Sequence, residues 1–460
     1  MAKERPKVLL TPELCKGCGR CIEACPKHAI SLGEDINQVS GLVPIQIDYG
    51  ICNHCGLCVS ACPEPYGLGA KVYELEDPAK LYGERDRDTT PAEDIPSQRI
   101  PLPKVEPMLL KGNYAAALGA LLAGCRHVFG YPITPSTEGA ELMAKLLPKL
   151  DGVFLQAVSE VATVNHMYGC GGAGLPTMTF TSSPGFSLML EGISYMIGAE
   201  LPGVFINVMR PGPGLGFIGP EQSDIKLCCR GLGHGNTHAI VLTPSSPQEM
   251  LDFTMMAFEL SFKYRNPVVV AADGYLGQIT GRVNLPDYLI KPGLPSWAVW
   301  GDAAHSGNLN SSIFQDYSDL EKHNWHLSAK YREMVRNEQR STGYKLEGAE
   351  ILVVACNTPA RMAKAAVERL RREGIPVGLF QPITLWPFPI NDLSPLLDQA
   401  KDILIVEASD GQLEDELRLA LHHANVLEEF RFHNVQHMGG ILPETQEVYE
   451  KVKEMVEVSQ

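Results

Sequence analysis

The sequence predicts an α/β protein of several domains, with a small cysteine-rich module at its amino end. Its 460 residues exceed the length of a single ordinary domain. Apolar strands alternate with helical segments in two separate series, which is the pattern of parallel α/β sheets. Eight of the 13 cysteines are confined to two short blocks near the start of the chain.

Composition and charge narrow the classes of function. Hydrophobic residues make up 45% of the chain and charged residues 20%, which is enough apolar material for a sizeable core. The net charge of −15 argues against a nucleic-acid or anionic-membrane surface, because both require clustered Lys and Arg. No apolar run approaches the roughly 18 residues of a membrane span, and the opening MAKERPKVLL lacks the apolar centre of an export signal. We therefore expect a cytoplasmic protein without a membrane span.

The chain divides into five segments. Residues 1–73 contain both cysteine blocks, and residues 74–107 are rich in proline and acidic residues, which is typical of an extended linker. Residues 108–285 and 346–460 each alternate strands with helices and are predicted to be two α/β domains. Residues 286–345 are irregular and polar, and we expect a connecting segment there.

The first α/β domain opens with a predicted helix at 113–125, where Gly124 suits the carboxyl end. A short strand and a turn follow at 127–135. Apolar strands and helical segments then alternate at 152–158, 159–174, 176–183, 186–200 and 202–209, and a buried strand is predicted at 266–273.

The second α/β domain is smaller and also predicted to be doubly wound. Its expected elements are a strand at 349–356, a helix at 358–374, strands at 375–380 and 401–409, a further helix, and a final segment at 447–458.

Each cysteine block has the spacing C-x2-C-x2-C-x3-C-P, which is the run found in bacterial two-cluster ferredoxins. Three cysteines at this spacing wrap one iron–sulfur cube, and the fourth, followed by Pro26 or Pro63, reaches the other cube. The predicted ligand sets are Cys15, Cys18, Cys21 and Cys62 for one 4Fe-4S cluster, and Cys52, Cys55, Cys58 and Cys25 for the other. C-x2-C pairs also bind zinc, but two fourfold blocks with a proline behind each favour iron–sulfur clusters. The amino-terminal module is therefore predicted to be an electron relay.

The remaining five cysteines are scattered, and we expect them to be small buried hydrophobic residues. Cys228 and Cys229 lie near His234 and His238 in the sequence, but their spacing fits no familiar zinc site. The five are Cys125, Cys170, Cys228, Cys229 and Cys356.

Beyond the linker, the sequence resembles the α subunit of 2-oxoacid:ferredoxin oxidoreductases. The resemblance covers nearly everything from residue 108 onward, in the expected order. It rests on GYPITPSTEGAE (130–141), QAVSEVATVNHMYG (156–169), TSSPGFSLMLEGISY (181–195), VMRPGPGLGFIGPEQSD (208–224), GLGHG (231–235), KYRNPVVVAADGYLGQ (263–278), PITLWPFP (382–389) and EASDGQLEDELR (407–418). It implies a pyrimidine-binding domain for thiamine diphosphate, followed by a transketolase C-terminal-like domain whose main role is assembly, and a fused α+β dicluster ferredoxin domain.

The resemblance also implies an activity: thiamine-dependent oxidative decarboxylation of a 2-oxoacid with coenzyme A, giving an acyl-CoA, carbon dioxide and two electrons. MRPGPGLG and KYRNPVVVAADGYLGQ look most like the branched-chain, 2-oxoisovalerate type. Action on 2-oxoglutarate, pyruvate or an aryl oxoacid is the alternative within the family. A non-catalytic electron-transfer adaptor is the alternative of another class.

Three residues match catalytic positions of the family. Glu160 matches the glutamate that hydrogen-bonds the pyrimidine ring of thiamine, although it could also be an ordinary helix-start glutamate. Arg210 matches the arginine that faces the substrate carboxylate, where a guanidinium offers a planar pair of donors. Thr134 matches a hydroxyl donor to the substrate, although its proline neighbours also suit a simple turn.

The loop TSSPG is expected to line the same pocket, so that Ser182, Ser183 and Gly185 would contact the cofactor. His234 is a weaker candidate, because many histidines are ordinary core residues.

The chain lacks the motif with which thiamine enzymes bind the diphosphate through Mg²⁺. ADGYLGQ (272–278) and SDGQLED (409–415) are the nearest matches, and neither has the expected context. The resemblance therefore implies a partner β subunit that supplies the Mg²⁺ and diphosphate ligands and a further 4Fe-4S cluster. A γ subunit and a ferredoxin that accepts the electrons are the other expected partners, and the chain is expected to be active only with its β subunit.

Overall fold

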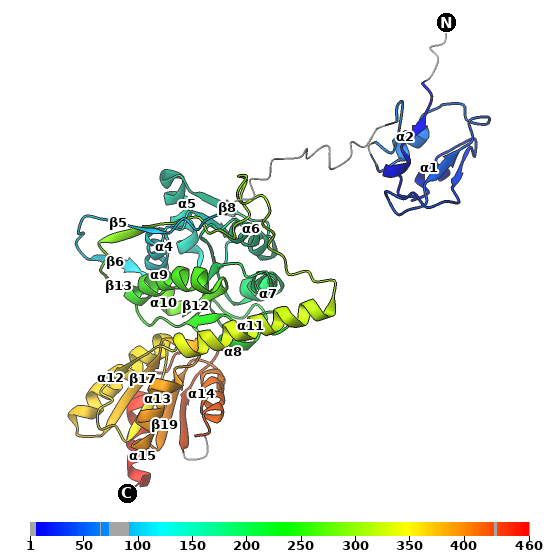
Figure 1. The fold of residues 1–460 in the computed structure, drawn as a ribbon. Coiled ribbons are helices and arrows are strands. Elements are labelled where there is room, and N and C mark those ends of the chain that lie inside the picture. The colour runs from blue at the N-terminus through cyan, green and yellow to red at the C-terminus, as the bar shows by residue number, and fades with distance from the viewer. Residues whose placement is uncertain (1–5, 65, 73–91, 427–429, 460) are drawn as a thin grey trace. The chain divides into compact units, whose positions relative to one another are not determined.

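The computed structural model describes residues 6–64, 66–72, 92–426 and 430–459. The chain divides into two compact units, residues 1–88 and 89–460 (Figure 1). Each unit is described by itself.

The small unit is an α+β fold made of two short antiparallel strand pairs and two short helices. β1 pairs with β4, and β2 pairs with β3. Its buried apolar centre is small, and it includes two of the cysteines, Cys21 and Cys58. The elements are β1 (Leu9–Leu10), a 3-10 turn (Pro12–Leu14), α1 (Arg20–Glu23), β2 (Ile30–Leu32), β3 (Ile45–Ile47), α2 (Leu57–Ala61) and β4 (Leu68–Gly69).

The large unit is built on a seven-stranded sheet with the strand order β18-β11-β12-β10-β9-β7-β8. All neighbours are parallel except β18, which pairs antiparallel with β11. The strands are β7 (His127–Gly130), β8 (Val153–Gln156), β9 (Thr177–Thr181), β10 (Gly203–Met209), β11 (Ile240–Leu242), β12 (Pro267–Asp273) and β18 (Thr384–Trp386).

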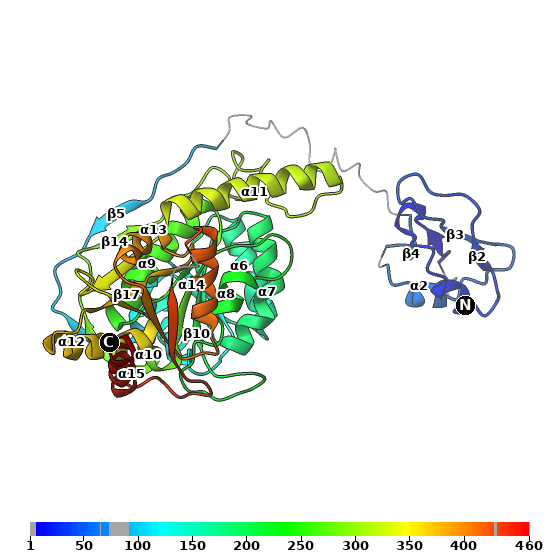
Figure 2. The same ribbon diagram turned by 90° about the horizontal axis from the view of Figure 1, so that it is seen from below.

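Helices cover both faces of this sheet (Figures 1 and 2). α4, α5 and α9 pack together on one face, and α6 packs beside α7 on the other, as right-handed crossovers between these strands require. Because both faces are covered, every residue of β9, β10 and β12 is buried. The helices are α4 (Gly112–Leu122), α5 (Thr137–Leu146) with a 3-10 turn (Leu147–Leu150), α6 (Glu160–Gly172), α7 (Ser183–Gly198), α8 (Ile225–Arg230), α9 (Pro247–Tyr264) and α10 (Gly274–Gln278).

A second sheet of five strands follows, in the order β15-β17-β16-β19-β20. Its central strands are parallel, and β15 pairs antiparallel with β17 at one edge. The elements are β15 (Ser341–Tyr344), β16 (Ile351–Val354), α12 (Asn357–Arg372), β17 (Val377–Pro382), α13 (Ile390–Leu393) with a 3-10 turn (Ser394–Asp398), β19 (Asp402–Glu407), α14 (Gln412–His423), β20 (Arg431–Gln436) and α15 (Thr445–Ser459). The α/β prediction is thus confirmed for both series.

The predicted linker differs from the structure at its carboxyl end. Residues 98–101, assigned to the linker from their composition, form β5 (Gln98–Pro101), which pairs antiparallel with β14 (Tyr288–Lys291). β6 (Met108–Lys111) pairs in the same way with β13 (Thr280–Val283). These pairings join segments far apart in the chain, so local composition does not reveal them. The part of the predicted linker at 74–91 lies outside the described residues.

The segment 286–345, expected to be irregular, contains α11 (Tyr317–Asn337), a helix of 21 residues. Only Leu327, Tyr331 and Met334 are buried along it, at the spacing of one helical face. The other positions are mostly polar, which is why composition suggested a loop.

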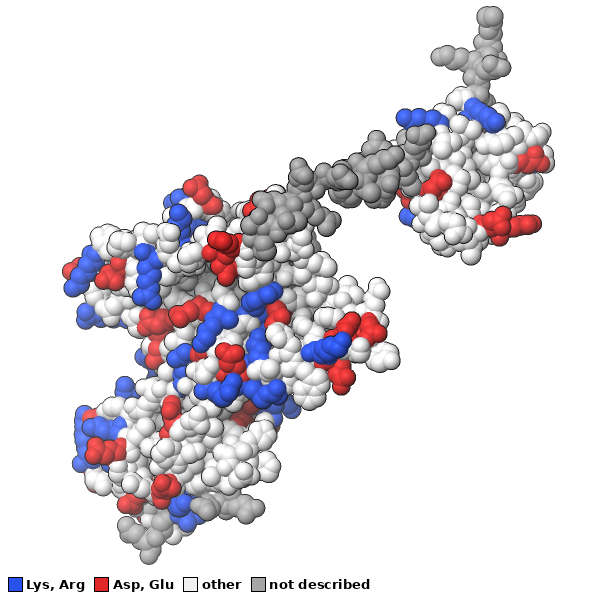
Figure 3. Space-filling view, in the orientation of Figure 1, with Lys and Arg blue, Asp and Glu red and all other residues white. Residues whose placement is uncertain are grey.

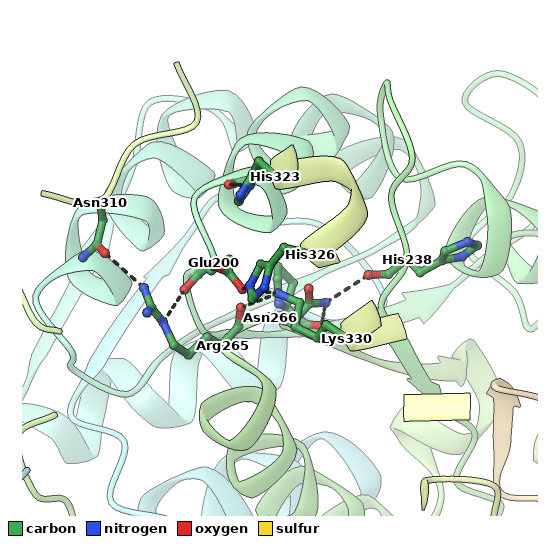
Figure 4. A network of polar contacts seen from close by, with 10 residues as sticks. Glu200, His238, Arg265, Asn266, Asn310, His323, His326 and Lys330 are labelled. Carbon is green, nitrogen blue, oxygen red and sulfur yellow. Dashed lines mark hydrogen bonds and ion pairs between the residues drawn. The ribbon is translucent and has the colours of Figure 1, made fainter. Parts of the chain in front are cut away.

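A network of polar contacts holds α11 against the body of the large unit (Figure 4). Glu200, at the end of α7, accepts hydrogen bonds from Lys330 (Nζ to Oε1, 3.0 Å) and pairs with His326 (Nε2 to Oε1, 2.9 Å) on α11. Arg265 donates from Nε to the Glu200 carbonyl (3.1 Å) and from Nη2 to Asn310 (3.1 Å). Burial raises the pKa of Glu200, but Lys330 and His326 outweigh it and leave the pKa below its usual value.

Acidic and basic side chains are intermixed over the described surface in view (Figure 3). Among the described residues, none of the helices combines the length and the apolar composition needed to cross a lipid bilayer.

Candidate active site and cluster sites

The eight cysteines of the two blocks surround two hollows in the small unit. One hollow is lined by Cys15, Cys18, Cys21 and Cys62, together with Leu10, Ile45 and Leu68. The other is lined by Cys25, Cys52, Cys55 and Cys58, together with Val8, Ile30 and Ile47. In each set, three cysteines come from one block and the fourth from the other, which is the grouping that the motif predicts.

The two blocks have the same backbone geometry. Gly17 and His54 occupy equivalent positions with φ of 61° and 54°, and Gly19 and Gly56 precede α1 and α2 with φ of 78° and 82°. These left-handed residues turn the chain around each hollow, so that successive cysteines point inward. The internal repeat in the sequence is therefore also a repeat of structure.

The hollows suit a cluster better than a single ion. Four cysteines around a mostly apolar hollow are the donor set of a 4Fe-4S cluster. Burial raises the pKa of the Cys21 thiol to about 11.

The second site lies at the carboxyl ends of β7, β8, β9 and β10 in the seven-stranded sheet. The chain leaves β7 toward β8 and leaves β9 toward β10, so the order of strands reverses between β7 and β9. Such a reversal opens a crevice beyond the strand ends, where α/β sheets bind ligands. The residues predicted from the family motifs follow these four strands.

Glu160 is the first residue of α6 and is buried, with 6% of its surface exposed. Ser159 caps this helix by accepting a hydrogen bond from Ala162 N (3.2 Å). A Cβ atom at Gly185 would lie 2.7 Å from Glu160 Oε1 and 2.6 Å from Thr181 Oγ1. The carboxylate therefore lies against the first turn of α7, and a glycine at 185 leaves room for it.

Arg210 follows β10 directly and is also buried, with 8% exposed. Its guanidinium donates from Nη1 to the Thr134 carbonyl (2.9 Å) and from Nη2 to the Leu215 carbonyl (3.3 Å). Its backbone N–H donates to Ser183 Oγ (3.0 Å). Arg210 thus connects the turn after β7, the start of α7 and the glycine-rich loop after β10.

Thr134 lies beside Arg210. The backbone carbonyl of Thr134 meets the guanidinium, whereas its side chain is exposed on the open side of the turn. The role of the Thr134 hydroxyl as a donor to the substrate stays a prediction.

Several buried polar atoms around the crevice have no hydrogen-bond partner among the described residues. They are Thr181 Oγ1, Ser182 Oγ and Arg210 Nε. Buried polar groups in folded proteins nearly always have partners, and these three belong to the TSSPG loop and to Arg210. The TSSPG loop and Arg210 are thus brought together with Glu160.

Some residues of the site carried no signal in the sequence. Asn113 Nδ2 and Gln278 Nε2 both donate to the Pro135 carbonyl (2.8 and 3.1 Å) and to Glu138 Oε2 (3.2 and 2.8 Å), which fixes the turn that carries Thr134. Gln278 is the last residue of the ADGYLGQ motif, so this motif contributes one residue that fixes the turn. Asn113 is a polar residue in a mostly apolar helix. This contrast was the feature of the sequence that could have indicated a role for it.

Asp273 of the same motif has another use. It accepts hydrogen bonds from Leu276 N (2.9 Å), Thr358 N (2.8 Å) and Thr358 Oγ1 (2.9 Å), so it caps α10 and fixes the start of α12.

His234 lies away from the residues grouped around Arg210. Its Nδ1 is 3.3 Å from Ser194 Oγ, and its ring packs edge-on against Tyr195, both on the later part of α7. Cys228 and Cys229 are fully buried in the large core, as expected of small hydrophobic residues.

Three family models match the parts of the chain that contain these sites. Residues 118–339 match the thiamine diphosphate-binding domain model of pyruvate flavodoxin/ferredoxin oxidoreductases, and residues 349–448 match core domain II of pyruvate:ferredoxin oxidoreductase. Residues 14–65 match the 4Fe-4S dicluster domain model. The ketoisovalerate oxidoreductase subunit VorB of Methanothermobacter thermautotrophicus is 46% identical over 349 residues, which is 75% of this chain and 97% of the relative.

The chain belongs to the 2-oxoacid:ferredoxin oxidoreductase family. The 2-oxoglutarate synthase subunit KorA of Methanocaldococcus jannaschii is 36% identical and covers 67% of this chain and 90% of the relative. A solved 2-oxoglutarate:ferredoxin oxidoreductase from Magnetococcus marinus, with 2-oxoglutarate, coenzyme A and succinyl-CoA bound, superposes with a TM-score of 0.68. It is 26% identical, and the match covers 76% of this chain and 65% of that one.

The resemblance found in the sequence is thereby confirmed, and so is the fused dicluster 4Fe-4S module. As a member of the 2-oxoacid:ferredoxin oxidoreductase family, the chain is a subunit of an oxidoreductase.

Proposed function

We propose that this chain is the pyrimidine-binding subunit of a 2-oxoacid:ferredoxin oxidoreductase that acts on a branched-chain 2-oxoacid such as 2-oxoisovalerate. With coenzyme A, the reaction would give an acyl-CoA and carbon dioxide. The electrons would pass through the two clusters of residues 1–73 to ferredoxin. The observation that carries the proposal is the grouping of two buried residues, Glu160 and Arg210, around the start of α7 beyond the carboxyl ends of four strands.

The residues of the crevice fit thiamine diphosphate. Thiamine supplies a carbanion that attacks the oxo carbon and accepts the electrons left after decarboxylation. Glu160 would share a proton with the pyrimidine ring, and Ser182, Ser183 and Gly185 would line the space beside it. Gly185 supports this assignment, because a side chain there would displace the Glu160 carboxylate.

Arg210 would bind the substrate carboxylate. Two of its nitrogens hold the carbonyls of Thr134 and Leu215, so the guanidinium is fixed in place before substrate binds. A fixed guanidinium presents a planar set of donors that suits a carboxylate. Thr134 would donate from its hydroxyl to the oxo or carboxylate oxygen of the substrate.

The preference for a branched-chain substrate has two supports. The ketoisovalerate oxidoreductase subunit is 46% identical to this chain, against 36% for the 2-oxoglutarate synthase subunit. The loop held by Arg210 also carries the exposed apolar side chains Leu215, Phe217 and Ile218, which suit an aliphatic substrate better than a second carboxylate.

A partner subunit is part of the proposal. Asp273 is committed to α10 and Thr358, so ADGYLGQ does not offer a free carboxylate for Mg²⁺. We assign the Mg²⁺ and diphosphate ligands and a further 4Fe-4S cluster to a β subunit, and we expect a γ subunit in the complex.

The test is reduction of a viologen dye by the purified complex with a panel of oxoacids. We expect reduction only when an oxoacid and coenzyme A are both present, with 2-oxoisovalerate giving a higher kcat/KM than 2-oxoglutarate, pyruvate or an aryl oxoacid. Highest kcat/KM with 2-oxoglutarate would overturn the substrate assignment. Electron transfer without any turnover of an oxoacid would show that the chain is a non-catalytic electron-transfer adaptor.

The role of Arg210 is tested by Arg210→Met. Loss of a hydrogen bond to a charged group costs about 1.5–3 kcal/mol, so we expect kcat/KM for the oxoacid to fall by about 10- to 100-fold. The visible absorbance of the clusters should not change. Arg282→Met, at an exposed position on β13, is the matched control. Unchanged kinetics for Arg210→Met would remove this residue from the site.

A further inference from the structure

The backbone of Arg210 is held by two serines. Ser183 Oγ accepts from Arg210 N (3.0 Å), and Ser223 Oγ donates to the Arg210 carbonyl (2.7 Å). The two hydroxyl oxygens are 3.4 Å apart. Ser223 lies in the turn that leads into α8, so the position of that turn determines the position of Arg210.

This turn is held from the second sheet domain by Gln412. Its Nε2 donates to the Ser223 carbonyl (2.7 Å), and its Oε1 accepts from Lys226 N (2.9 Å). One side-chain amide therefore spans the turn and uses both its donor and its acceptor. Gln412 belongs to the SDGQLED motif at residues 409–415.

Gln412 is itself rigidly placed. It is the first residue of α14, and the buried Glu407 at the end of β19 accepts from Leu413 N (2.8 Å) and Glu414 N (3.3 Å) at the start of this helix. A cap of this kind fixes the first turn of a helix. The chain of contacts thus runs from β19 through α14 to the turn and on to Arg210.

Other contacts also dock the two domains, and they do not involve Gln412. Gln222 exchanges two hydrogen bonds with the backbone of Ala408 (2.7 and 2.8 Å). Further along α14, Glu416 Oε1 accepts from Arg230 Nε (2.8 Å). These contacts can hold the domains together when Gln412 is changed, so the effect of Gln412 on Arg210 can be separated from domain docking.

We propose that Gln412 is a positioning residue that orients Arg210 toward the 2-oxoacid through Ser223. The transketolase C-terminal-like domain would then take part in substrate recognition as well as assembly. The inference rests on the proposed role of Arg210.

The test compares Gln412→Met with Glu416→Gln in the assembled complex. Methionine keeps the length and apolar body of glutamine but cannot bridge the turn. We expect Gln412→Met to raise KM for the oxoacid about five- to twentyfold, with KM for coenzyme A unchanged and kcat changed less than twofold. Glu416→Gln, which breaks a docking contact on the same helix, should leave KM for the oxoacid unchanged.

A double-mutant cycle with Ser223→Ala identifies the route. If Gln412 acts through Ser223, the double variant should be no worse than the worse single variant, because both break the same path. Additive effects, an unchanged KM in Gln412→Met, or an equal rise in Glu416→Gln would each overturn the inference. If Arg210→Met also left KM for the oxoacid unchanged, the proposed function of Arg210 would fail instead. Thermal melting of each variant shows whether a change in KM reflects misfolding.

Discussion

Gly185 shows how a single residue can define the cofactor pocket. It lies in the first turn of α7, where its missing side chain leaves room for the carboxylate of Glu160 and the hydroxyl of Thr181. A glycine inside a helix is normally destabilising by up to about 1 kcal/mol relative to alanine. The glycine at this position therefore indicates that the Glu160 carboxylate needs the space that a side chain would fill.

We expect Gly185→Ala to weaken binding of thiamine diphosphate while the fold is retained. The added methyl group would force the Glu160 carboxylate away, since Cβ and Oε1 would be only 2.7 Å apart. The measurement is the concentration of thiamine diphosphate that restores half of the activity to the cofactor-depleted complex, and we expect a rise of at least tenfold. Gly169→Ala in α6, where an added Cβ meets nothing within 4 Å, should behave as the wild type.

At the scale of residues, motifs predicted the site better than composition did. Glu160, Arg210 and the TSSPG loop lie together because each follows a strand, and parallel strands end at one edge of the sheet. The hydrogen bond from Arg210 to the Thr134 carbonyl could not be predicted, because it depends on how the turn after β7 folds. Asn113 and Gln412 could not be predicted either, since each acts across a fold-dependent contact.

Among the elements, α11 depends on one partly buried carboxylate. Glu200 meets Lys330, whose side chain is only 9% exposed, and His326. Removing one member of such a pair leaves a charge buried without a partner, which costs about 3–5 kcal/mol. The polar sequence of α11 hides this dependence, because the partner of Lys330 lies in another segment.

We expect Glu200→Gln to lower the free energy of unfolding at pH 7 by a few kcal/mol. The pKa of Glu200 lies below its usual 4.5 in the folded chain, so its contribution is fully present above that value. It is lost as the pH falls through the folded pKa. The difference between variant and wild type, measured by urea unfolding, should therefore shrink as the pH falls below about 4.5.

Asp319→Asn is the control for this prediction. Asp319 pairs with Lys322 on the same helix, but both side chains are largely exposed, so the pair should contribute little. A loss at pH 7 no larger for Glu200→Gln than for Asp319→Asn would contradict the assigned role of Glu200.

For the whole molecule, the two units should differ in their dependence on iron. The buried apolar centre of the small unit consists of Val8, Cys21, Ile30, Ile45, Cys58 and Leu68. So small a core rarely stabilises a fold alone, and two of its members are predicted cluster ligands. The large unit has an extensive core of its own.

We expect oxidation and chelation of iron to unfold the small unit and leave the large unit folded. Limited proteolysis with mass spectrometry should then show rapid cleavage within residues 6–72 and protection within 92–426. Calorimetry should show one transition unchanged and the other lost. Protection of residues 6–72 after complete removal of iron would contradict this expectation.

The architecture as a whole was predictable in kind, but its boundaries were not. Alternating apolar strands and helices predicted both sheets, because each such segment has to bury its own apolar face. The β5–β14 and β6–β13 pairings and the return of β18 to the first sheet are contacts between distant segments, and local composition does not encode them.

The return of β18 limits how this protein can be divided. Val241 and Leu242 of β11 face Trp386 and Thr384, which come from a segment that otherwise belongs to the second sheet. A gene cut near residue 345 would leave β11 as a bare strand edge with unpaired amides and carbonyls, a surface prone to aggregation. The two α/β domains are therefore expected to be inherited, expressed and engineered together as a single polypeptide.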